Sequence, residues 1–143
     1  MQAVTLETDS AAATEQVAAT LAADLEPGDI ILVTGDVGTG KTTFVRGACR
    51  ALGVTDRVTS PSFTIGQLYR GRVPVAHIDL FRLDSLAGED PGLLERYLAP
   101  DTVTFVEWPG AAGADLDPDR VVLAVRLTHL GGDRRRIVAE PPS

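Results

Sequence analysis

Residues 30–52 read IILVTGDVGTGKTTFVRGACRAL, and this stretch contains three patterns in succession. The apolar run at 30–33 lies between the turn residues EPGD and a glycine-rich segment, which predicts a short strand buried on both faces. From 42 to 52 the apolar residues recur at helical spacing, and Gly53 is expected to end the helix. The stretch therefore predicts a strand, a glycine loop and a helix, in that order.

The loop GDVGTGKT at 35–42 matches the pattern glycine, any four residues, glycine-lysine-threonine, which is the signature of a phosphate-binding P-loop. Its glycines let successive backbone N–H groups turn toward phosphate oxygens, and the following helix adds its positive N-terminal end. Lys41 is the one lysine among 13 basic residues, and an arginine fork is not equivalent to a slender ammonium at this crowded position. We expect Lys41 to contact the terminal phosphates of a bound nucleotide and the Thr42 hydroxyl to bind Mg²⁺. The predicted nucleotide-binding residues are Gly35, Asp36, Val37, Gly38, Thr39, Gly40, Lys41, Thr42 and Thr43.

Two acidic residues directly follow apolar runs, as a nucleotide site of this class requires. Asp79 follows VPVAHI and Glu107 follows TVTFV. In an open α/β sheet, ligands lie beyond the carboxyl ends of the strands, where both acids would project. One acid could bind Mg²⁺, directly or through water, and the other could do the same or orient the attacking water. The candidate catalytic residues are Lys41, Asp79 and Glu107, and the candidate metal ligands are Thr42, Asp79 and Glu107.

The remaining segments complete a single α/β domain over residues 1–143. Further strands are expected at 3–8, 63–69, 71–81 and 101–108, with helices at 9–25, capped by Asp9 or Ser10, and at 84–100, mostly after Pro91. Residues 109–119 are expected to form a long loop, and 120–130 with 134–141 an antiparallel hairpin near the C-terminus. We therefore predict a P-loop NTPase-like domain whose central sheet is mainly parallel and flanked by helices.

Composition narrows the classes of function. A chain of 143 residues with 44% apolar residues suits one domain, and its apolar runs fall far short of the roughly 20 residues that a membrane span needs. The N-terminus does not resemble an export signal, so we expect a cytoplasmic protein without membrane contact. A net charge of −7 argues against direct binding to a nucleic-acid backbone, so any contact with tRNA is expected to be indirect, through partners.

Four short motifs follow one another along the chain: GDVGTGKTTF, TSPSFT, HIDLFRL and VEWP. Each motif other than the glycine loop is weak alone, but in this order they resemble the TsaE family, also called YjeE, over about residues 8–110. The resemblance implies a small P-loop ATPase that uses ATP and Mg²⁺. It also implies work with TsaD and TsaB-type proteins, which form threonylcarbamoyladenosine in tRNA next to the anticodon. Hydrolysis is expected to be weak in the isolated chain and stimulated by these partners.

The resemblance also implies roles for further residues. Ser60 or Thr64, in a switch-like segment at 59–64, would respond to the terminal phosphate. Asp79 would correspond to a Walker-B-like aspartate, and Glu107 would join the metal shell. Trp108 either covers the strand end as a half-buried aromatic or contacts the nucleotide region or a partner protein.

For several other residues, and for the function of the chain, the sequence allows alternatives. We interpret His77 as a hydrogen-bonded strand residue rather than a catalytic base, and Cys49 as a small buried helix residue. Arg82 could pair with an acid or reach a phosphate, and the arginines at 134–136 could form a solvated strand or contact tRNA. The chain could also be a P-loop small-molecule kinase, or a nucleotide-dependent binding switch with incidental hydrolysis.

Overall fold

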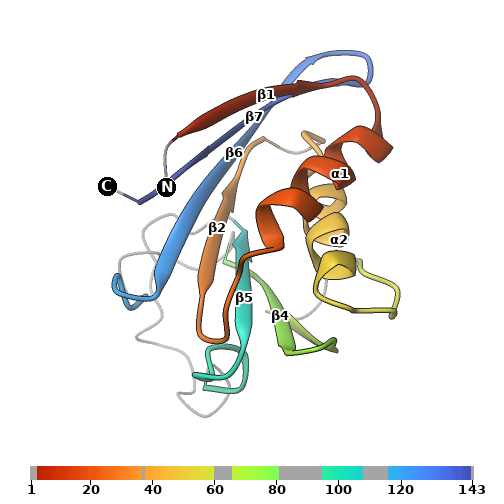
Figure 1. Ribbon diagram of the computed structural model, residues 1–143. Helices are drawn as coiled ribbons and strands as arrows, with labels where there is room; N and C mark the ends of the chain where they lie inside the picture. The colour runs from red at the N-terminus through yellow and green to blue at the C-terminus, as the bar shows by residue number, and fades with distance from the viewer. Residues whose placement is uncertain (1–2, 37, 60–65, 81–94, 108–115, 143) are drawn as a thin grey trace.

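The computed structural model describes residues 3–36, 38–59, 66–80, 95–107 and 116–142. Within them, helices α1 and α2 lie together on one face of a seven-stranded sheet (Figure 1). The elements in chain order are β1 (Val4–Thr8), α1 (Ala11–Ala22), β2 (Ile30–Thr34), α2 (Lys41–Ala51), β3 (Gly66–Arg70), β4 (Pro74–Asp79), β5 (Val103–Glu107), β6 (Val121–Gly131) and β7 (Arg134–Glu140). No helix in the described part of the chain is long and apolar enough to span a membrane.

The sheet is mixed, with the strand order β1-β7-β6-β2-β5-β4-β3. Its central neighbours β6, β2, β5 and β4 run parallel, whereas the pairs β1–β7, β7–β6 and β4–β3 are antiparallel. The mainly parallel sheet that the sequence predicts is therefore parallel only at its centre. The physical reason is connection length, because strands joined by turns as short as those after β3 and β6 can pair only antiparallel. The predicted C-terminal hairpin is confirmed as β6 and β7.

Helix α1 begins where its sequence predicts. Of the two candidate caps, Ser10 is the one used: its Oγ accepts a hydrogen bond of 3.0 Å from the Ala13 N–H. Helix α2 crosses α1 closely at Gly47, where an added Cβ would lie 2.4 Å from the backbone oxygen of Glu15. The missing side chain at this position therefore lets the two helices approach each other.

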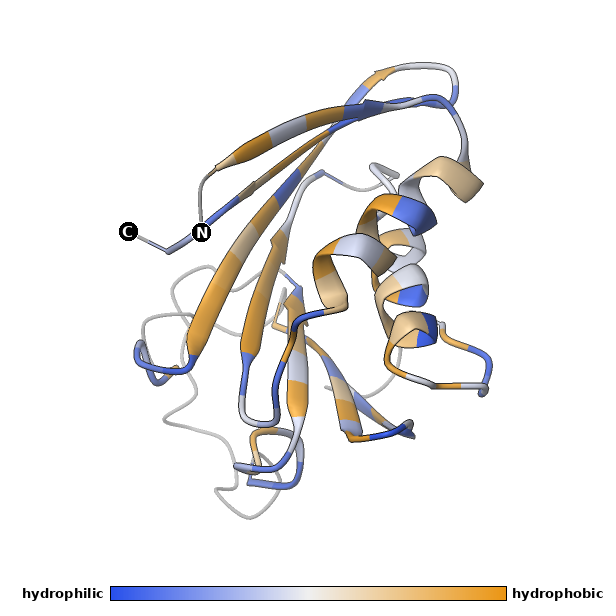
Figure 2. Ribbon diagram, viewed as in Figure 1, coloured by the Kyte–Doolittle hydropathy of each residue, from blue (hydrophilic) through white to orange (hydrophobic). Residues whose placement is uncertain are grey.

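Apolar side chains fill both faces of the central strands. One buried cluster lies between the helices and the sheet and includes Ile31, Phe44 and Phe105, while a second on the other face includes Ile78 and Val106. Figure 2 shows apolar residues along the central strands and polar residues at many of their turns. Because side chains alternate along a strand, the residues at 75, 77 and 79 of β4 share the helix-covered face with 103, 105 and 107 of β5. The ends of these two strands thus project toward the start of α2.

Parts of the predicted architecture lie outside the described residues. They include most of the helix expected at 84–100 and most of the loop expected at 109–119.

Candidate functional site

The glycine loop connects the carboxyl end of β2 to the first turn of α2. Gly40 is the N-cap of α2, has φ +96°, and provides no side-chain hydrogen bond to the helix. The N–H groups of the first helical turn are therefore not capped by a side chain and can serve a ligand. Gly35 has φ +145°, and an added Cβ there would lie 2.6 Å from both the Leu127 carbonyl oxygen and Thr39 Oγ1. The loop thus needs glycine at this position.

Lys41 lies across the loop rather than in open solvent. Its Nζ donates hydrogen bonds of 2.7 Å to the Gly35 carbonyl and 3.0 Å to the Asp36 carbonyl, and the residue is 7% exposed. Burial of the Lys41 ammonium lowers its pKa. The negative charges of Glu107, Asp79 and Asp36 act in the opposite direction on this pKa without cancelling the effect of burial. The lysine is therefore within electrostatic range of both strand-end carboxylates.

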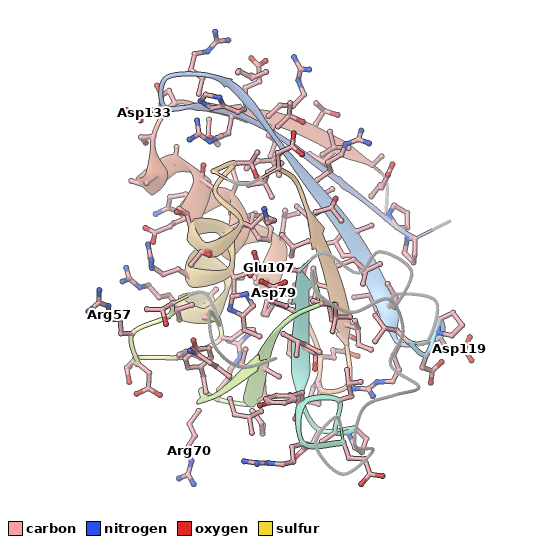
Figure 3. The ribbon with its side chains drawn as sticks, turned by 180° about the vertical axis from the view of Figure 1, so that it is seen from behind. Arg57, Arg70, Asp79, Glu107, Asp119 and Asp133 are labelled. Carbon is pink, nitrogen blue, oxygen red and sulfur yellow. The ribbon has the colours of Figure 1, made fainter. Side chains whose placement is uncertain are left out.

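Asp79 and Glu107 are direct neighbours at the ends of parallel strands β4 and β5, where they pair in register. Figure 3 shows the two side chains close together beside α2. Glu107 is 3% exposed, whereas Asp79 is half-buried. Two adjacent carboxylates repel each other, so this arrangement favours cations at the mouth of the loop. Here the structure brings together the three candidate catalytic residues that the sequence predicts.

His77 lies on β4, two residues before Asp79, and is fully buried. Its Nε2 is hydrogen-bonded to Glu107 Oε2. The interpretation of His77 as a hydrogen-bonded strand residue is thus confirmed. The partner could not be known from the sequence, because it depends on the register between β4 and β5.

Arg135 reaches the same loop from β7 and was missed by the sequence prediction. Its Nε donates to the Thr39 carbonyl at 3.1 Å and its Nη2 to the Gly38 carbonyl at 3.2 Å. The interpretation of the arginine segment as a solvated strand did not include this contact of the half-buried Arg135, whereas Arg134 and Arg136 are exposed and contact Glu7. Strand alternation was the available signal, because Arg135 shares its face with the buried residues at 137 and 139.

Two hollows flank the loop. One, of about 540 Å³, is bordered by Asp36, Arg126 and Thr128 among others. The other, of about 80 Å³, lies between the N-terminal ends of α1 and α2 and is bordered by Thr43, Asp133 and Arg135 among others. Both sides of the glycine loop are therefore open enough to admit parts of a ligand.

The donor set suits a hard cation. Within the described residues, no group of three or more His, Cys, Asp and Glu side chains could hold a metal ion. Mg²⁺ commonly takes only one or two carboxylates and completes its shell with water and substrate phosphates. Asp79 and Glu107, with the partly buried Thr42 in the first turn of α2, fit that requirement.

Several predicted residues lie outside the described part of the chain. They are Val37 of the loop, the candidate switch residues Ser60 and Thr64, Arg82, and the candidate partner contact Trp108.

Comparison with known proteins identifies the family. The sequence profile of the Threonylcarbamoyl adenosine biosynthesis protein TsaE family matches residues 8–137. The chain belongs to the TsaE family. A TsaE protein of Bacillus subtilis (strain 168) is 37% identical over 125 residues, which cover 87% of this chain and 77% of that relative. A TsaE protein of Synechocystis sp. is 43% identical over 108 residues, covering 68% of this chain and 64% of that relative.

A solved structure has a similar fold. The crystal structure of Bacillus subtilis YdiB superposes with a TM-score of 0.78 at 30% sequence identity, covering 99% of this chain and 87% of the YdiB chain. The family expected from the four motifs is therefore confirmed, and the match to the family profile extends beyond them into β7.

Proposed function

We propose that this TsaE-family chain is the ATP-binding and ATP-hydrolysing subunit of the machinery that forms threonylcarbamoyladenosine in tRNA. The observation that carries the proposal is the position of Lys41, which lies across the glycine loop within electrostatic range of two strand-end carboxylates. The names of the relatives supply the pathway, because the TsaE proteins of Bacillus subtilis and Synechocystis are named for the biosynthesis of this nucleoside.

The proposed P-loop site divides its work among a few groups. Backbone N–H groups of the loop and of the first turn of α2 bind phosphate oxygens, and Lys41 neutralises charge on the terminal phosphates. Thr42, Asp79 and Glu107 would hold Mg²⁺, which when bound neutralises phosphate charge. If only one of the two acids binds the cation, the other orients the attacking water; if both bind it, the water is oriented within the metal shell.

The remainder of the nucleotide would lie on the Thr43 side of the loop. The hollow bordered by Thr43, Asp133 and Arg135 lies there, next to the first turns of both helices. We infer that the ribose and base enter this side while the terminal phosphate faces Asp79 and Glu107. This orientation places the bond to be broken beside the two acids.

Partners complete the proposed activity. We expect slow hydrolysis by the isolated chain and faster turnover with TsaD and TsaB-type proteins, with hydrolysis driving a reset or an exchange of partners. A net charge of −7 favours contact with tRNA through those proteins rather than directly. We place this work in the cytoplasm.

The test is ATP turnover by the purified chain, alone and with TsaD and TsaB-type proteins, for the wild type and Lys41→Ala. We expect release of inorganic phosphate that rises with partners and is lost in the variant. Turnover of Lys41→Ala at the wild-type rate would contradict the proposed site. Transfer of the phosphoryl group to an added metabolite, in place of its release, would instead indicate a kinase.

A further inference from the structure

His77 is a polar side chain in an interior position of β4. The residue is fully buried, and on its face of the sheet Phe105 lies directly opposite. Its Nε2 reaches diagonally toward the carboxyl end of the sheet and bonds to Glu107 Oε2, whereas Asp79 is the residue that faces Glu107 in register. The imidazole is therefore directed at one of the two strand-end acids.

The chemistry of this pair fixes the direction of the hydrogen bond. An ionised carboxylate can only accept hydrogen bonds, so the N–H at His77 Nε2 donates the hydrogen bond to Glu107. Such a bond restricts the rotation of a carboxylate that is 3% exposed. It also satisfies part of the hydrogen-bonding need of a group that would otherwise be costly to bury.

The other ring nitrogen indicates that this bond is the reason for a histidine here. His77 Nδ1 is buried and has no hydrogen-bond partner within the described residues. Burying a polar atom without a partner costs stability, and an apolar side chain of similar size would avoid that cost. A residue whose only role was to fill the space between β4 and the helices would therefore not need an imidazole.

We propose that His77 is a positioning residue that holds the Glu107 carboxylate in its orientation toward the phosphate loop and the proposed cation. This inference rests on the proposed function, in which Glu107 serves ATP hydrolysis. In this role His77 acts through Glu107 alone. Replacing a residue that hydrogen-bonds to a metal ligand, without touching the metal itself, typically changes activity or metal affinity 10- to 100-fold.

Two substitutions separate positioning from packing. His77→Leu introduces an apolar side chain of similar bulk and removes the donor, whereas the amide of His77→Gln can still donate to Glu107. For ATP hydrolysis with partner proteins present, we expect His77→Leu to lower kcat about 10- to 100-fold with KM within about twofold. His77→Gln should recover most of the loss.

A second measurement does not depend on turnover. Calorimetric titrations with ADP, with and without Mg²⁺, give the gain in ADP affinity that the cation provides. We expect His77→Leu to reduce this gain about tenfold or more while leaving ADP affinity without Mg²⁺ unchanged. In a Glu107→Gln background, His77→Leu should have no further effect on kcat or on the Mg²⁺ gain, because its action passes through that carboxylate.

Thr104→Val is the matched control. Thr104 is fully buried on β5, its Oγ1 donates to the Tyr97 carbonyl at 2.7 Å, and it lies on the other face of the sheet. This variant should lower the melting temperature and leave kcat unchanged.

The proposal is overturned if His77→Leu keeps the wild-type kcat and Mg²⁺ gain, or if His77→Gln is as impaired as His77→Leu. It is also overturned if the loss persists in the Glu107→Gln background. Wild-type turnover that does not depend on Lys41 would instead contradict the proposed function itself.

Discussion

The two ends of the central parallel strands each carry a cation that donates to loop carbonyls, but the surroundings of the two cations differ. At the amino end, Arg120 donates to the carbonyls of Gly28, Leu98 and Ala99 at 2.7, 2.6 and 3.1 Å. At the carboxyl end, Lys41 donates to two carbonyls of the glycine loop. The lysine lies near the buried Glu107 and the half-buried Asp79, at a helix N-terminus that has no side-chain cap.

The comparison shows how the same interaction can serve structure at one end and a ligand at the other. The planar fork of arginine matches three fixed carbonyls, so Arg120 ties a turn to the segment before β5. Lys41 is a compact charge whose pKa is lowered by burial, while the acids nearby act in the opposite direction. A bound polyphosphate would further favour the charged form of Lys41. Arg120 needs no such ligand, because an arginine side chain stays charged.

The largest expected effect belongs to the acid beside the lysine. Glu107→Gln keeps the shape of the side chain but removes the negative charge near the bond to be broken. We expect ATP hydrolysis with partners to fall about 100- to 1000-fold while ATP affinity changes less than about fivefold. Rapid-quench kinetics and calorimetry measure the two quantities, and an equal loss in both would remove the distinction between catalysis and binding.

Arg120 tests the structural end of the comparison. Arg120→Met removes the guanidinium donor from three carbonyls, although the Ala99 carbonyl still accepts a hydrogen bond of 3.1 Å from the Thr102 N–H. The free energy of unfolding should therefore fall by about 2–3 kcal/mol. Urea unfolding measures this loss, and ATP affinity of the folded protein should not change. Arg57, an exposed arginine at the periphery of Figure 3, provides the control, because Arg57→Met should alter stability by less than about 0.5 kcal/mol. A loss of ATP affinity in Arg120→Met would show that the two ends are coupled.

A smaller effect is expected at Gly38 and Thr39 of the glycine loop, whose carbonyls Arg135 binds. Arg135→Ala removes two donors to the loop carbonyls of Gly38 and Thr39, at about 1 kcal/mol in total, so the Kd for ATP should rise about three- to tenfold. Arg134→Ala, the neighbouring change on the other face of β7, should leave the Kd unchanged. Equal effects of the two variants would indicate a general loss of positive charge rather than support of the loop.

The smallest effect is expected at Cys49, which is buried on the same helix, α2, as Lys41. Burial alone raises the pKa of Cys49 from 9.0 to about 12, about two helical turns from Lys41. Below pH 9 the thiol is neutral in both the folded and unfolded states, and between pH 9 and 12 only the unfolded state ionises. The stability advantage of wild type over Cys49→Ala should therefore shrink as pH rises, by roughly 1 kcal/mol at pH 10, as urea unfolding would show. A constant difference between pH 7 and pH 10 would contradict this burial.

Local patterns allowed much of the fold and the centre of the site to be predicted. The glycine loop, the two strand-end acids and the Ser10 cap depend on residues adjacent in sequence, and strand periodicity located the strands. The pairing of β1 with β7, the His77–Glu107 hydrogen bond and the contact of Arg135 with the loop depend on which strands become neighbours and in which register. That information is tertiary, so no single segment contained it.

Calorimetric titration of the purified chain with ATP and Mg²⁺ shows whether the glycine loop binds ATP through Lys41. Lys41→Ala and Arg120→Met are measured in parallel. We expect one ATP bound per chain in the wild type and in folded Arg120→Met, and no detectable binding by folded Lys41→Ala. Absence of binding by the wild type at millimolar ATP, or equal affinity in Lys41→Ala, would contradict it.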